Sequence, residues 1–222
     1  MEPEIEKALE LARLHKKLRG DTSDVITELH VSHAASLGGL KNFPELEVLI
    51  IAGCDPVSPS DLPPLESLLS LRINDSGLRN VAGMEKLPRL RILRIQRNFV
   101  RDLTPLLECT LTTLEVAGNP LSEESYGEVL PKLVERGCEV SCSGEREWRA
   151  ALRLSNANIP LSCYENDGRY YLCSPGLGVT KFPDYDHPEV EISEVEGLLD
   201  RDPGELLRVF ESRGGIWSSP DA

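Results

Sequence analysis

Five short apolar segments of one form recur along the chain, and this repetition constrains the fold more than any other feature. The clearest copy is residues 90–98, which reads L-x-x-L-x-I-x-x-N. The copies start at residues 26, 46, 68, 90 and 111, so successive starts are 20, 22, 22 and 21 residues apart. A period this short and regular predicts stacked units, each of which buries its apolar face against its neighbours.

The centre of each copy is expected to be a short β-strand. Successive side chains of a strand point to opposite faces, so Leu93 and Ile95 should point into the stack and Arg94 should point out of it. The ninth position holds Asn98 or its equivalents Asn119, Cys54, Ser76 and Ala34. A small polar side chain there can bond backbone groups of the neighbouring unit that would otherwise have no partner.

This pattern resembles the leucine-rich repeat over about residues 24–142, and its short period is similar to that of compact intracellular and bacterial-type repeats. The resemblance implies an α/β solenoid, an arc whose parallel strands form a concave sheet. It also implies a protein-binding role for that concave face. Return segments rich in proline are expected to hold 3₁₀ turns or short helices on the convex side.

The termini of the repeat region have their own signals. Residues 3–19 form an expected helix with an apolar stripe, acidic residues at its start and basic residues at its end, so residues 1–23 read as an N-terminal cap. Residues 122–137 predict a helix bent at Pro131, and residues 138–142 a sixth strand that closes the sheet.

Residues 143–222 lack the repeat and resemble no family. A helical turn at 148–154 and a hairpin of residues 159–164 and 169–173 indicate a small α+β appendage. Capping boxes at Ser193 and Asp202 precede two short helices, and the tail from residue 213 should be frayed.

Composition limits the partners. The net charge is −13 and the pI about 4.8, which disfavours binding to nucleic acid or anionic lipid. No secretory signal and no run of about 20 apolar residues is visible, so a cytoplasmic protein without a membrane partner is expected. A monomer is the expected oligomeric state.

The sequence shows no pattern typical of a catalytic or metal site. The six cysteines form no C-x-x-C pair, no histidine stands at zinc-ligand spacing, and reduced buried thiols are expected. His30 and His33 should lie on opposite faces of a strand. The acidic stretch 184–191 lacks the glycine and glutamate of a calcium loop, and the stretch 176–181 lacks Walker spacing. We therefore expect no enzyme activity, cofactor or metal.

The side chains that the repeat leaves pointing outward are the candidate binding site for a partner protein. Arg72 and Arg94 should lie about 5 Å apart in one column of the sheet, among apolar neighbours, as is typical of interface centres. The alternative is that glutamates of the same face, a loop or the appendage neutralise or cover them. The candidate site comprises Glu28, His30, Ile50, Arg72, Asn74, Ile92, Arg94, Gln96 and Arg97.

Two other functions remain open on the sequence. The acidic run from Asp184 to Glu205 could serve an inhibitor or immunity-type protein that neutralises a basic enzyme or toxin. An enzyme could instead have its site in the appendage, around Tyr164, Asp167, Arg169 and Tyr170. Neither has a motif to support it.

Overall fold

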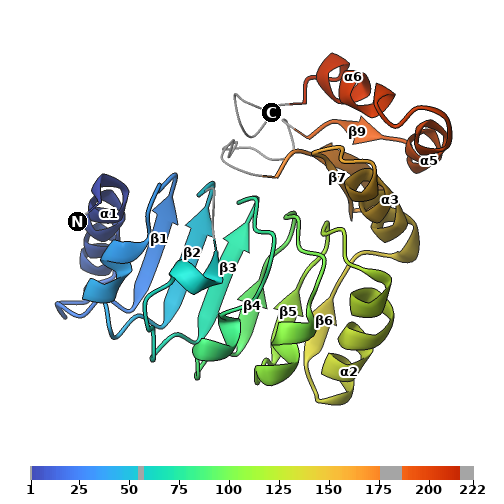
Figure 1. The fold of residues 1–222 in the computed structure, drawn as a ribbon. Coiled ribbons are helices and arrows are strands. Elements are labelled where there is room, and N and C mark those ends of the chain that lie inside the picture. Colours follow the sequence, from blue (N-terminus) through green and yellow to red (C-terminus); the bar gives the residue numbers. More distant parts are fainter. Residues whose placement is uncertain (1, 55–57, 176–186, 216–222) are drawn as a thin grey trace.

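The repeated segments form one six-stranded sheet. The computed structural model describes residues 2–54, 58–175 and 187–215. All neighbouring strands are parallel, and their order in the sheet is their order in the chain (Figure 1). The strands are β1 (Glu28–Ser32), β2 (Val48–Ala52), β3 (Ser70–Asn74), β4 (Ile92–Arg94), β5 (Thr113–Glu115) and β6 (Glu139–Ser141).

The register of the sheet follows the sequence repeat. Leu49 pairs with Leu71, and Leu71 with Leu93, so equivalent positions of successive units stand side by side. These leucines are fully buried, as are the isoleucines two residues later in each unit. The return segments contain 3₁₀ helices at Gly38–Asn42, Pro59–Asp61, Met84–Lys86 and Thr104–Glu108. This arrangement is a leucine-rich-repeat-like α/β fold.

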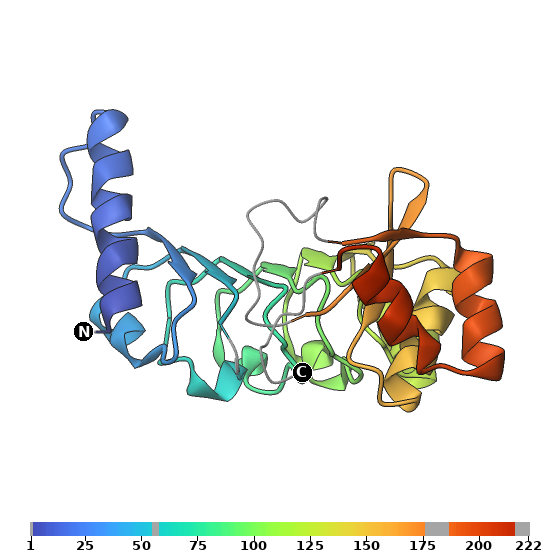
Figure 2. The ribbon, with the colours of Figure 1, turned by 90° about the horizontal axis from the view of Figure 1, so that it is seen from above.

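Helices cover both ends of the sheet, as expected. Helix α1 (Pro3–Leu18) packs Ile5, Ala8 and Leu9 over the β1 edge, and its C-terminal part extends past the sheet in Figure 2. At the other end, a π-helical segment (Ser125–Val129) runs into α2 (Leu130–Glu135). The bend expected at Pro131 is therefore realised as a π-helical turn just before the proline, where the helical hydrogen bonds change spacing.

The appendage has more residues in helices and strands than the sequence indicated. It contains a second apolar core built around Leu154, Leu172, Val195 and Phe210. Its elements are α3 (Glu145–Asn156), β7 (Ser162–Asn166), β8 (Arg169–Cys173), β9 (Glu189–Val190), α5 (Ile192–Arg201) and α6 (Glu205–Ser212).

Three details of the appendage differ from expectation. Helix α3 begins at Glu145, because the Glu147 side chain accepts a hydrogen bond from the backbone N–H of Gly144 and caps the helix there. Strand β9 was not expected, because two residues carry no readable alternation. Helix α5 starts after Glu191 rather than after Ser193, so the predicted capping box is wrong. The last part of the expected frayed tail, residues 216–222, lies outside the described residues.

Aromatic and polar contacts join the two cores. Trp148 of α3 stacks on Tyr126 with ring centroids 3.8 Å apart, and its indole N–H donates to the Leu121 carbonyl at 2.8 Å. The Ser162 hydroxyl donates to the Gly118 carbonyl at 2.6 Å. A Cβ at Gly118 would lie 3.3 Å from that of Tyr164, so this close approach favours glycine. The appendage thus lies beyond the carboxyl ends of the last strands (Figure 1).

Two further observations complete the fold. None of the helices in the described ranges is long and apolar enough to cross a bilayer. All six cysteines are free thiols, and Cys142 is the exposed one among them.

Candidate functional site

The outward side of the sheet brings together most of the residues predicted from the sequence. Pairing aligns His30 with Ile50, Ile50 with Arg72, and Arg72 with Arg94, and it then aligns Arg94 with Glu115. These five side chains form the central column of the face, because each occupies the same position of its strand. We call this column, together with the flanking residues Glu28, Asn74, Ile92 and Gln96, the concave face.

Several of the predicted residues interact with one another. The guanidinium Nε of Arg94 lies 2.6 Å from a carboxylate oxygen of Glu115, so this arginine is neutralised by its neighbour in the column. The Asn74 amide donates to the Gln96 side-chain oxygen at 3.0 Å. The Arg94 charge is thus balanced within the face, although the guanidinium keeps further N–H donors and Gln96 keeps its amide N–H donors.

Arg72 is different. Its side chain is exposed, and within the described ranges it forms no ion pair. Its neighbour in the column, Ile50, is a half-buried apolar residue, as is Ile92 on the next strand. An uncompensated arginine beside exposed apolar surface is the combination found at the centres of protein interfaces.

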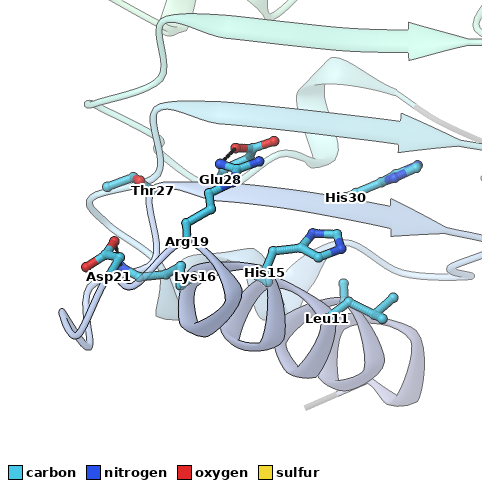
Figure 3. A pocket seen from close by; sticks show the side chains of 10 residues that line it. Leu11, His15, Lys16, Arg19, Asp21, Thr27, Glu28 and His30 are labelled. Atoms are coloured by element: carbon cyan, nitrogen blue, oxygen red, sulfur yellow. Dashed lines mark ion pairs between the residues drawn. The ribbon is translucent and has the colours of Figure 1, made fainter.

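The concave face continues into a groove beside α1. Figure 3 shows Leu11 and His15 of the helix opposite Glu28 and His30 of β1, around a hollow of about 160 Å³. A second hollow on the same helix shares Ala8, Leu11 and His30 with the first, so the groove follows α1. Leu11 is 47% exposed there, which leaves apolar surface accessible at the edge of the face.

His30 joins the groove to Arg72. Burial lowers the pKa of His30, and the positive charge of Arg72 lowers it further. Both effects favour the neutral imidazole. The positive charge of Arg72 remains on this part of the face, whereas Lys16 and Arg19 at the end of α1 pair with Asp21 and Glu28.

Arg97 lies beyond the end of the column, and its side chain is turned toward the appendage. β4 ends at Arg94, and the chain turns at Arg97 with a φ of 52°. The guanidinium makes two hydrogen bonds of 2.7 Å to the Asp75 carboxylate and lies 5.2 Å from the centre of the Tyr164 ring. Arg97 is thus part of the junction between the sheet and the appendage.

The turn after each strand has the same unusual backbone. The equivalent residues of five units all have positive φ, and two of them, Gly53 and Gly118, are glycines. His33, Asp75 and Arg97 adopt this conformation without being glycine, which costs about 1 kcal/mol each. The two glycines were the available sequence signal for this turn.

The residues suggested for an enzyme site do not converge. Tyr164 is buried in the junction, whereas Asp167 is exposed at the hairpin turn. Arg169 pairs with Glu189 at 3.0 Å, and Tyr170 is across from Glu165, so it points to the opposite face of the hairpin from Tyr164. The structure therefore assembles no catalytic group from these four residues.

The acidic run is largely engaged within the appendage. Glu194 pairs with Arg213, and Glu196 with Arg146, both within 2.7 Å. Asp200 and Glu205 also have arginine partners, Arg153 and Arg208. The start of the run, residues 184–186, lies outside the described residues. Its described part is less available to a basic partner than its sequence indicated.

Several solved protein structures are similar to this chain, and internalin C2 is one of them. Internalin C2 from Listeria monocytogenes str. 4b F2365 is 19% identical, with 65% of this chain and 87% of that chain covered and a TM-score of 0.39. No protein-family model matches the sequence, and no curated protein matches it.

Proposed function

We propose that the chain is a leucine-rich repeat solenoid and a non-catalytic module that binds a partner protein through its concave face. The observation that carries this proposal is Arg72, an exposed cation without an ion-pair partner in the described ranges, in a column with the apolar Ile50. The net charge is −13, so carboxylates outnumber cations in this chain. An arginine that none of the described carboxylates neutralises is therefore a candidate contact for a partner.

The charges around the groove indicate the chemistry of the partner. Lys16 of α1 and Arg19 just after it line the groove but pair with Asp21 and Glu28, at 3.0 and 3.9 Å. Arg72 lies beyond His30 and has no ion-pair partner in the described ranges. An extended segment with a carboxylate opposite Arg72 and an apolar residue against Leu11 or Ile50 complements this surface. The alternative of an acidic inhibitor is weaker, because the described carboxylates of the acidic run are mostly paired with arginines.

Substitution of Arg72 tests the proposal. Arg72→Glu should weaken partner binding at least about ten-fold, because it removes a positive charge at the interface centre and places a like charge against an acidic partner. The matched control is Arg89→Glu, the same charge change at an exposed residue of the return segment before β4.

The measurement is affinity capture from native lysate with the wild-type chain and both variants, with each captured protein quantified by mass spectrometry. A protein retained by wild type and Arg89→Glu but lost with Arg72→Glu supports the concave face. Equal retention by all three chains overturns it. Both variants should unfold within about 0.5 kcal/mol of wild type, since both sites are exposed.

A further inference from the structure

Three potential metal ligands meet at the junction of the sheet and the appendage. Asp75 follows β3, Cys173 ends β8 and His187 precedes β9. One donor atom from each, a carboxylate oxygen, a thiol sulfur and an imidazole nitrogen, all lie within 4.8 Å of one another. Cys173 is fully buried and His187 is 7% exposed, so the group is enclosed.

We propose that Asp75, Cys173 and His187 bind a zinc ion that fastens the appendage to the repeat sheet. Thiolate, imidazole and carboxylate are the three protein ligand types of Zn²⁺, whereas Ca²⁺ and Mg²⁺ take oxygen ligands only. Three protein ligands leave one tetrahedral position for water. Donor atoms around a bound zinc lie about 3.5 Å apart, so a closure of about 1 Å completes the site.

The neighbouring residues already hold two of the ligands. The Tyr164 hydroxyl lies 2.9 Å from Nδ1 of His187, a contact that orients the imidazole ring. The Arg97 guanidinium holds both oxygens of the Asp75 carboxylate at 2.7 Å, and each oxygen keeps a second lone pair for a metal. Outer contacts of this kind orient the ligands of protein metal sites.

Zinc binds the thiolate of Cys173, so binding releases the thiol proton to solvent as the zinc–sulfur bond forms.

Cobalt and zinc titration tests the proposal. The full chain is prepared reduced, without a histidine tag, and with Cys142→Ser to remove the exposed thiol. Co²⁺ should bind one to one, with the absorption of a tetrahedral ion and a thiolate-to-cobalt charge-transfer band. Zn²⁺ should displace it and raise the Tm with the logarithm of its free concentration above Kd.

Three variants identify the ligands. Cys173→Ser, His187→Gln and Asp75→Asn should each weaken Co²⁺ binding at least about ten-fold, and Cys173→Ser should also remove the charge-transfer band. Cys138→Ser, which changes a buried thiol in another part of the chain, should bind as well as the parent. Circular dichroism shows which variants fold. Absence of stoichiometric binding by the parent chain, or a charge-transfer band that survives in Cys173→Ser, overturns the proposal.

Discussion

Replacement of Asn98 by alanine is expected to lower the free energy of unfolding by about 4 kcal/mol. The Asn98 side chain is fully buried. Its oxygen accepts hydrogen bonds from the backbone N–H groups of Ser76 and Leu78, each at 3.0 Å. Its amide donates to the carbonyls of Ile73, Ile95 and Gln96 at 2.7, 3.1 and 3.0 Å. Alanine removes this partner from the two N–H groups and from the Ile73 carbonyl, at about 1 to 1.5 kcal/mol each in a dry interior. The Ile95 carbonyl keeps the Asn119 amide and the Gln96 carbonyl keeps the Asp75 N–H, so these two add little.

A second substitution at this position separates lost hydrogen bonds from lost volume. Asn98→Asp keeps the shape but directs a carboxylate oxygen at three carbonyls, so it should destabilise at least as much as alanine at pH 7. The folded protein then favours the protonated carboxyl, whose pKa is raised. Stability should therefore recover as the pH falls through that raised pKa, because the protonated group can donate again.

Urea denaturation followed by circular dichroism measures both variants. Asn80→Ala is the control, because Asn80 is an exposed asparagine of the return segment, and it should change stability by less than about 0.5 kcal/mol. A loss below about 1 kcal/mol for Asn98→Ala would show that water or a local shift satisfies the backbone groups.

The repeat region was predictable because its signal is local and periodic. Leu93 and Asn98 occupy positions that the period defines, so the strand register and the buried asparagine followed from the spacing of identical residue types. The same period placed Arg72 and Arg94 in one column. It also placed Glu115 on that face, among the glutamates that could neutralise them. The structure shows that Glu115 pairs with Arg94 and leaves Arg72 exposed.

The junction could not be predicted from the same signal. The period assigns Arg97 a place just after the strand, but the direction of its side chain depends on a backbone turn of positive φ that residues other than glycine seldom adopt. The partners of Arg97 in the appendage, including Tyr164, come from a segment without any repeat. The grouping of Asp75 with Cys173 and His187 requires the relative position of both cores, which no local pattern encodes.

Loss of the Arg97 side chain is expected to lower the free energy of unfolding by about 3 kcal/mol. The Asp75 carboxylate is only 20% exposed and makes two charge-assisted hydrogen bonds to Arg97. In Arg97→Ala it becomes a largely buried charge without its partner, and the contact with the Tyr164 ring is also lost. The Asp75 pair lies within the repeat region and the Tyr164 contact reaches the appendage, so Arg97→Ala should lower the melting temperature of the chain.

The matched control is Arg101→Ala, which also crosses the junction. Its guanidinium bonds Ser155 and Asn156, but the side chain is exposed and neither partner is charged. We expect a loss below about 1 kcal/mol for this variant. A similar loss of unfolding free energy in both variants would show that the ion pair with Asp75 contributes no more than the neutral hydrogen bonds of Arg101.

Glycine at position 97 separates the side chain from the backbone. Arg97→Gly loses the same contacts as Arg97→Ala, but it removes the strain of a positive φ, which alanine retains. Arg97→Gly should therefore be about 1 kcal/mol more stable than Arg97→Ala. Differential scanning calorimetry of both variants measures this difference. If Arg97→Gly is the less stable of the two, the positive φ at residue 97 carries no strain energy. The Asp75–Arg97 ion pair is then not needed to offset such strain.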